Sequence, residues 1–224
     1  MIVTIDGPAG SGKSTAARKL AARMELPYLD TGSMYRAIAY QALHDQLDIA
    51  EPDALARLAA GLDLVVDCGP THTRVRVNGH DVSEAIRGMA VSSATPRVAS
   101  NQRIRDLLVE KQRDIGARLG SLVTEGRDQG SVVFPDADVK FVLEASLEKR
   151  ARRRYEELIA DGEDADFEQV KANLAERDRN DAVQWAALLE PGAAVLIDTT
   201  RLSIPQVVDR LVAHIRQLTG RNIE

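Results

Sequence analysis

The stretch that decides the fold of this chain is Gly7-Pro8-Ala9-Gly10-Ser11-Gly12-Lys13-Ser14-Thr15. It fits the pattern G-x-x-x-x-G-K-[ST]. The β-branched run Ile2-Val3-Thr4-Ile5 precedes it and predicts a buried strand, and apolar residues at helical spacing follow it from Ser14 to Met24. Strand, glycine-rich loop and helix in this order are typical of a phosphate-binding P-loop.

The residue types in this loop suit a polyphosphate. Glycines let successive backbone N–H groups point at phosphate oxygens, and the N-terminus of the following helix adds a partial positive charge. In this pattern Lys13 reaches the β- and γ-phosphates, and the Ser14 hydroxyl ligates Mg²⁺. The alternative is a glycine-rich turn with a chance lysine, at a frequency on the order of one in a hundred for a chain of this length. We therefore predict that residues 7 to 15 bind phosphates and that Ser14 binds the metal.

Composition predicts a globular protein. Of its 224 residues, 44% are hydrophobic and 28% charged, enough for one sizeable core with a small inserted lobe. The net charge of −5 gives no reason to expect nucleic-acid binding. The one cysteine, Cys68, excludes an intramolecular disulfide and fits a reducing cytosol. The sequence has no targeting signal or apolar stretch of membrane-spanning length, so we expect a cytoplasmic protein.

Strand and helix signals alternate along most of the chain, which predicts an α/β fold with a mainly parallel sheet. Further strands are expected at 28–30, 122–124, 139–143 and 194–197, and helices at 33–45, 103–119 and 204–218. Residues 62–88 break this alternation, because their strand-like runs surround the hairpin-type turn Asn78-Gly79 and predict a small antiparallel lobe. The acidic segment 161–166 is expected to be a mobile loop between helices.

One polar cluster follows the strand expected at 28–30. Asp30 and Ser33 are suited to cap the next helix, and Arg36 lies one turn into it. Capping plus a surface arginine is the simpler interpretation of this cluster taken alone.

A second cluster of acidic, basic and glycine residues, which runs from Glu125 to Asp136, follows the strand expected at 122–124. The carboxyl ends of parallel strands are where open α/β sheets bind ligands. Arg127 is therefore a candidate for a phosphate, and Asp128 for a sugar hydroxyl or a position near the metal. The alternative is a plain turn with an ion pair.

A third cluster is rich in arginine. Arg150, Arg152, Arg153 and Arg154 lie in one predicted helix, and Arg177-Asp178-Arg179-Asn180-Asp181 ends the next. Four arginines in five positions cannot share one helix face, so at least one is expected to be a surface charge. A hinged basic segment closing over a polyphosphate would neutralise charge and exclude water. The alternative is a solvated helix face.

Together these segments resemble the bacterial cytidylate kinases, members of the nucleoside monophosphate kinase group. The resemblance spans nearly the whole chain in order and at family spacing. Its most specific part is the run Gly126-Arg127-Asp128-x-Gly130-x-Val132-Val133-Phe134-Pro135-Asp136. The other matching segments are 5–15, 29–36, 145–146 with 150–154, 176–181 and 196–200.

The resemblance implies a P-loop three-layer fold with a parallel five-stranded core, an inserted monophosphate-binding lobe and a short helical lid. The core would comprise 1–61 and 89–224, including a lid around 150–180, and the lobe 62–88. The implied reaction transfers the γ-phosphoryl group of ATP to CMP or dCMP, with Mg²⁺. The implied protein is a monomer whose partners are these nucleotides, with neither nucleic acid nor membrane.

Residue roles are carried onto the matching positions. Residues 7 to 15 would hold the phosphates of ATP, with Arg153 beside them. The residues that would hold the CMP phosphate, sugar or base are Asp30, Ser33, Arg36, Arg105, Arg127, Asp128, Arg177 and Asp181. The residues that would be catalytic are Lys13, Arg127, Arg150 and Arg154, the last two from the lid.

Three positions depart from the family pattern. Gln184 stands where the family usually has an arginine, and Pro96 where it usually has a serine. Both positions bear on recognition of cytosine or sugar, so the preference among CMP, dCMP and UMP stays open. Gln129 stands where the family usually carries an apolar residue.

Two alternatives to this function remain. A kinase of the same architecture would phosphorylate another small acceptor, such as UMP, AMP or a non-nucleotide hydroxyl compound. A nucleotide switch would bind partners instead, but the sequence lacks an N/T-K-x-D-type stretch for reading guanine, and the arginines favour transfer. The second metal ligand stays open between Glu125 and Asp128.

We predict that replacing Lys13 with alanine lowers turnover strongly and leaves the fold intact. The reason is that catalysis of phosphoryl transfer depends on positioning and charge stabilisation, to which Lys13 contributes an ammonium. Steady-state turnover and circular dichroism measure the two effects. Near-normal turnover in a folded Lys13→Ala variant would contradict the role assigned to Lys13.

Overall fold

The computed structural model describes residues 1–160 and 162–220, without the side chains of 180–184. Within these residues the centre is a sheet of five strands in the order β2-β6-β1-β7-β8. The strands are β1 Ile2–Asp6, β2 Tyr28–Asp30, β6 Leu122–Glu125, β7 Val139–Glu144 and β8 Val195–Asp198. Each neighbouring pair is parallel. The predicted parallel core is therefore confirmed.

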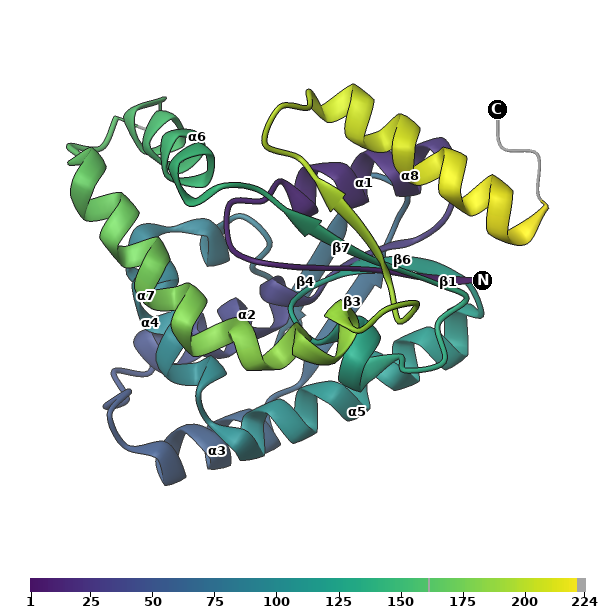
Figure 1. Ribbon diagram of the computed structural model, residues 1–224. Coiled ribbons are helices and arrows are strands. Elements are labelled where there is room, and N and C mark those ends of the chain that lie inside the picture. Colours follow the sequence, from purple (N-terminus) through teal and green to yellow (C-terminus); the bar gives the residue numbers. More distant parts are fainter. Residues whose placement is uncertain (161, 221–224) are drawn as a thin grey trace.

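Helices lie on both sides of this sheet and make three layers (Figure 1). On one side, α1 Lys13–Arg23 and α8 Ile204–Thr219 share an apolar core with β1 and β7, in which Ile5, Phe141 and Leu211 are fully buried. The helices on the other side are α2 Thr31–His44, α3 Pro52–Gly61, α4 Met89–Ala99 and α5 Gln102–Leu119. This is the predicted three-layer α/β fold.

A second, antiparallel sheet packs beside α2, in the order β3-β4-β5. Its strands are β3 Leu64–Cys68, β4 Thr73–Val77 and β5 His80–Asp81, followed by the short helix η1 Ala85–Arg87. Asn78 and Gly79 turn the chain with φ of 51° and 82°, as a two-residue hairpin requires. The predicted antiparallel lobe is thus present, and its boundaries at 62–88 stay a prediction.

The hydroxyl of Thr73 joins the two sheets. It accepts the backbone N–H of Asp30 at 3.0 Å and donates to the carbonyl oxygen of Tyr28 at 2.7 Å. The apolar side chains of β3 and β4 belong to the same buried cluster as those of α2, α3 and α5. The lobe is therefore anchored to the edge strand β2 by hydrogen bonds and to the helices by a shared core.

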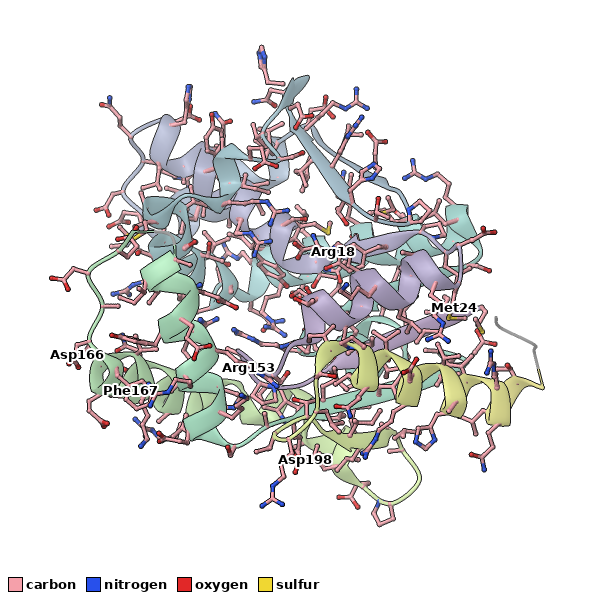
Figure 2. The ribbon with its side chains drawn as sticks, turned by 90° about the horizontal axis from the view of Figure 1, so that it is seen from above. Arg18, Met24, Arg153, Asp166, Phe167 and Asp198 are labelled. Atoms are coloured by element: carbon pink, nitrogen blue, oxygen red, sulfur yellow. The ribbon has the colours of Figure 1, made fainter. Side chains whose placement is uncertain are left out.

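The arginine-rich segment forms two packed helices, α6 Leu147–Ala160 and α7 Phe167–Trp185, followed by η3 Ala186–Leu189. Residues 162–166 connect the two helices outside any helix or strand, as expected, and residue 161 lies outside the described residues. Figure 2 labels Asp166 and Phe167 at the start of α7, where the Arg152 guanidinium lies 4.5 Å from the centre of the Phe167 ring. In the part of the chain described, no helix has the length and apolarity to cross a membrane.

Helices α3 and α4 and the turn η2 are among the elements that were not predicted from sequence. Helix α3 has a short amphipathic pattern, and α4 contains Pro96, which cannot donate a backbone hydrogen bond and weakens any helix signal. Gln129 to Val133 form a single turn of π-helix, η2, in the segment after β6. This turn is stabilised from outside, since Arg113 of α5 donates to the carbonyl oxygens of Val132 and Val133.

We predict that Thr73→Val destabilises the protein by about 1–3 kcal/mol, because it leaves the N–H of Asp30 and the carbonyl of Tyr28 buried without their partner. Thr73→Ser is the matched control, since it keeps the hydroxyl and removes only a methyl group. Chemical denaturation measures both. A serine variant as unstable as the valine variant would contradict the role of the hydroxyl.

Candidate active site

The P-loop runs from the end of β1 to the start of α1, in the predicted context of strand, loop and helix. Gly7 has a φ of 131°, and a Cβ there would lie 2.3 Å from the carbonyl oxygen of Leu143 on β7, so no side chain fits. Gly12 caps α1 in the left-handed region, with a φ of 92°. The loop therefore leaves β1 in close contact with β7, and the backbone geometry at Gly7 and Gly12 favours glycine.

Lys13 lies beneath this loop, with only 8% of its surface exposed. Its Nζ donates to the carbonyl oxygen of Pro8 at 2.8 Å. Burial lowers the pKa of Lys13 to about 8, Glu125 opposes this shift, and the charges of Arg127 and Arg177 add to it. Lys13, Arg127 and Arg177 come from three separate segments, and their positive charges repel one another near the loop. A polyphosphate among them would relieve their repulsion and raise the pKa of Lys13.

Ser14 and Glu125 meet across the two strands that flank this site. The Ser14 hydroxyl donates to Oε1 of Glu125 at 2.8 Å, and burial raises the pKa of that carboxyl group. A hydroxyl and a carboxylate are the hard oxygen ligands that Mg²⁺ takes from protein when phosphates supply the rest. The described residues hold no group of three or more histidine, cysteine or acidic side chains that would cage a metal by themselves. Of the two predicted second ligands, Glu125 is the one beside Ser14.

Asp6, the last residue of β1, is a buried carboxylate to which sequence reasoning gave no role. It accepts the backbone N–H groups of Gln129 and Gly130, both at 2.8 Å. Burial raises the pKa of Asp6 to about 7, although these two hydrogen bonds oppose the shift. Gly130 is required here, because a Cβ would lie 2.8 Å from the Thr4 hydroxyl. Asp6 thus holds the segment after Asp128 against the strand that leads into the P-loop.

Asp30, Ser33 and Arg36 lie together at the start of α2. Asp30 caps the helix by accepting the Ser33 N–H at 3.1 Å, and its other oxygen accepts from Arg36 Nη2 at 2.7 Å. The capping interpretation is therefore correct as local structure. Nε of Arg36 is buried and makes no hydrogen bond with the described residues, so this guanidinium retains a donor for an anion.

Arg105 of α5 and Asp128 form an ion pair of 2.5 Å, and both are largely buried. Tyr35 of α2 lies close to this pair and to Arg127. Burial and the charge of Asp128 raise the pKa of Tyr35 to about 12, although the charges of Arg105 and Arg127 oppose this shift. Tyr35 was not singled out from sequence, although it stands between Ser33 and Arg36. The predicted residues of the second cluster and α2 are thus neighbours in space.

The lid arginines hold the outer side of the P-loop. Arg150 is buried; it donates to the carbonyl oxygens of Ala9 and Ala145, and both terminal nitrogens pair with Asp178 of α7. Arg153 donates to the carbonyl oxygens of Gly10 and Ser11. In Figure 2 Arg153 lies between the green lid helices and the yellow segment that leads into α8. These two guanidinium groups therefore supply hydrogen-bond donors to carbonyl oxygens of the loop.

The remaining predicted site residues are exposed or lie outside the described part of the structure. Arg154 is exposed and pairs with Glu157 at 3.2 Å, and Arg152 is exposed as well, as expected for at least one arginine of this cluster. Arg177 is exposed on α7 and close enough to Lys13 to lower its pKa. The side chains of Asp181 and Gln184 lie outside the described residues.

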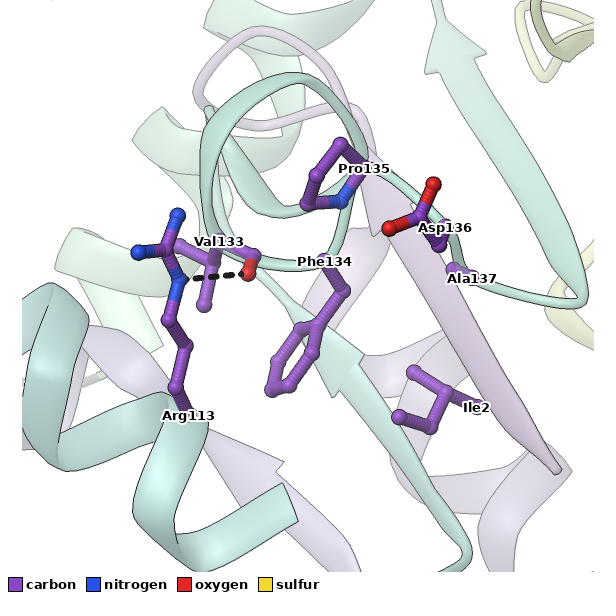
Figure 3. A pocket seen from close by; sticks show the side chains of 7 residues that line it. All are labelled: Ile2, Arg113, Val133, Phe134, Pro135, Asp136 and Ala137. Carbon is purple, nitrogen blue, oxygen red and sulfur yellow. Dashed lines mark hydrogen bonds between the residues drawn. The ribbon is translucent and has the colours of Figure 1, made fainter. Parts of the chain in front are cut away.

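A small cavity of about 290 Å³ lies apart from this site, between α5 and the segment after η2 (Figure 3). The residues around it are Ile2, Arg113, Val133, Phe134, Pro135, Asp136 and Ala137. Ile2 begins β1, whereas the P-loop follows the end of that strand. None of the predicted site residues lines this cavity, so it belongs to a different part of the molecule.

The site combines a P-loop and its lysine with a serine–glutamate pair and with arginines from three segments. This combination is typical of P-loop kinases. The family model for cytidylate kinase matches residues 3–217. A cytidylate kinase of Rhodococcus opacus (strain B4) is 42% identical over 221 residues, covering 98% of this chain and 96% of that relative. One of Geobacillus kaustophilus (strain HTA426) is 43% identical over 219 residues, covering 97% of each. The chain therefore belongs to the cytidylate kinase family.

Solved structures show the same fold at greater distance. The shikimate kinase from Bacteroides thetaiotaomicron has a TM-score of 0.51 with 11% identity, covering 96% of this chain and 98% of that chain. At this identity the similarity concerns the α/β fold alone. The family assignment rests on the family model and the sequence relatives.

We predict that kcat/KM for ATP falls above about pH 8, by about tenfold per pH unit. A lowered pKa means that Lys13 loses its proton in the free protein near pH 8 and no longer attracts phosphates. Phosphate groups are already ionised in this range. Because bound ATP raises the pKa of Lys13, kcat at saturating ATP should decline only at higher pH. Initial rates from pH 7 to 10 measure this, and a flat kcat/KM would contradict it.

Proposed function

We propose that this site transfers the γ-phosphoryl group of ATP to CMP or dCMP, with Mg²⁺ held by Ser14 and Glu125. The chain is an ATP-dependent phosphotransferase of the cytidylate kinase family, which acts on CMP. The single observation that supports the division of roles is the meeting of Lys13, Glu125 and Arg127 at the carboxyl ends of adjacent strands.

The donor half is the P-loop. Its N–H groups and Lys13 bind the β- and γ-phosphates, and the carbonyls on its outer side are occupied by Arg150 and Arg153. When bound, Mg²⁺ neutralises charge on the phosphates beside Ser14. Arg150 would have to release Asp178 before it could reach a phosphate, so in the conformation described it supports the loop. Arg154 on α6 and Arg177 on α7 are exposed, in contrast to Arg150.

The acceptor half is the set around α2, α5 and the end of β6. Arg36, Arg105 and Arg127 supply guanidinium groups suited to a phosphate, and Asp128 supplies a carboxylate suited to a sugar hydroxyl. Asp30 orients Arg36 through their ion pair. Ser33, Arg177 and Asp181 complete the proposed set. The lobe at 62–88, anchored beside Asp30 through Thr73, would cover the monophosphate.

The chemistry needs no general base. The acceptor phosphate is an anionic nucleophile at neutral pH, so the protein positions the two nucleotides and stabilises the charge that spreads over the transferred group. Lys13 and Arg127 contribute that stabilisation from opposite halves of the site.

We also propose that the protein acts as a monomer in the cytoplasm and binds no nucleic acid. The net charge of −5 supports the absence of nucleic-acid binding, and the single cysteine fits a reducing compartment. The large apolar side chains exposed among the described residues are spread over separate elements, from Leu43 to Leu218, which is typical of a monomer surface.

The acceptor is tested with a panel of CMP, dCMP, UMP and AMP at fixed ATP and Mg²⁺, with ADP release as the readout. We expect CMP and dCMP to be phosphorylated with kcat/KM at least about tenfold above UMP and AMP, since a polar site rejects an analogue that leaves its groups unpaired. The Lys13→Ala variant is the control for contaminating kinases. ADP release with CMP and dCMP no higher than with buffer would contradict the proposed function.

A further inference from the structure

A buried polar network lies directly behind Asp128. Gln129 of η2 and Gln112 of α5 are each 1% exposed, and Thr124 of β6 is completely buried. Burial of two amide side chains is unfavourable unless their polar atoms find partners. In addition, Gln129 stands where the cytidylate kinase family usually carries an apolar residue. These side chains therefore require an explanation beyond packing.

The Gln129 amide uses both of its ends. Its Oε1 accepts from the Thr124 hydroxyl at 2.9 Å, and its Nε2 donates to Gln112 Oε1 at 2.9 Å. The same Nε2 lies 3.4 Å from Oδ1 of Asp128. Strand β6 and helix α5 thus fix the rotation of the amide, so that its N–H side faces the carboxylate.

The backbone around Gln129 is built to admit this side chain. A Cβ at Gly126 would lie 2.9 Å from Cγ of Gln129 and 3.0 Å from its Nε2, so only glycine leaves the space. On the other side, Asp6 holds the N–H groups of Gln129 and Gly130. Both the backbone and the side chain of Gln129 are therefore held in place.

The two oxygens of Asp128 consequently face different donors. Oδ2 accepts from Arg105 Nη2, and Oδ1 faces the Gln129 amide. With a donor at each oxygen, the carboxylate plane is fixed. If the amide were removed, Arg105 would be the remaining hydrogen-bond donor to Asp128 among the side chains that the structure describes, and the carboxylate could turn about its terminal torsion, which is broad for an aspartate.

We infer that the pair Gln112 and Gln129 positions the Asp128 carboxylate for the acceptor nucleotide. Gln129 acts on Asp128 directly, and Gln112 acts through Gln129, so both are positioning residues. This inference rests on the proposed function, in which Asp128 belongs to the set that binds the acceptor nucleotide. The competing explanation is that the pair merely fills the space between α5, β6 and η2.

The test is the double variant Gln112→Met/Gln129→Met, which replaces both partners by unbranched apolar side chains of similar length. Removal of both partners of a buried hydrogen bond is tolerated better than removal of one. Gln102→Met, at an exposed position on the same helix, is the matched control. We expect KM for CMP to rise about five- to tenfold, with kcat and KM for ATP changed by less than about twofold. The control variant should match the unaltered protein.

A double variant that melts within a few degrees of the unaltered protein and keeps its KM for CMP would overturn the inference. So would equal changes in KM for CMP and for ATP, since a packing defect would affect both halves. If the unaltered protein fails to phosphorylate CMP, the proposed function fails, independently of the glutamines. The two failures are therefore distinguishable.

A double-mutant cycle with Asp128→Asn gives a second measurement. If Gln129 acts through Asp128, Gln129→Met should raise KM for CMP in the unaltered background and have little further effect when Asp128 is asparagine. An equal rise in both backgrounds would overturn the inference. Gln112→Met takes the place of Gln129→Met in this cycle if the latter does not fold.

Discussion

The parallel pairing of β1 with β6 is the constraint on which the site depends. Ile5 stands opposite Glu125 in this register, and the N–H of Gly126 donates to the Ile5 carbonyl at 3.1 Å. The chain leaves both strands at the same edge of the sheet, once into the P-loop and once into the segment of Arg127 and Asp128. Asp6 then joins the two exits through two backbone hydrogen bonds. Donor and acceptor halves are thus fixed to one another by main-chain geometry.

The P-loop is held on both of its sides. Phosphates are expected on the side of the N–H groups, whereas the carbonyls of Ala9, Gly10 and Ser11 point toward Arg150 and Arg153. A loop that points its N–H groups one way must point many of its carbonyls the other way, and buried carbonyls need donors. The two lid arginines meet that need. Helix α6 is therefore coupled to the loop even in the conformation described, and Asp178 extends the coupling to α7.

The sequence predicts those structural features that depend on local residue patterns. The glycine spacing around Lys13, the alternation of strands and helices and the Asn78-Gly79 turn each have a local cause, and each was predicted correctly. The sequence does not predict the hydrogen-bond partners of buried side chains. Asp6 binds residues more than 120 positions away, and Arg150 binds Ala9 across 141 positions. No periodicity in the sequence predicts hydrogen bonds between residues so far apart in the chain. Gln129 departs from the family pattern, but its partner Gln112 lies in another helix, where nothing in the local sequence marks it.

The bridge formed by Thr73 has a consequence for how the molecule unfolds. The antiparallel lobe has no separate apolar cluster among the described residues, because β3 and β4 share theirs with α2, α3 and α5. Loss of the lobe would expose that cluster and release the backbone of Tyr28 and Asp30 at once. The inserted strands therefore belong to the same cooperative unit as the parallel sheet. Shortening or grafting of this insertion would alter the stability of the whole kinase, although the insertion lies outside the central sheet.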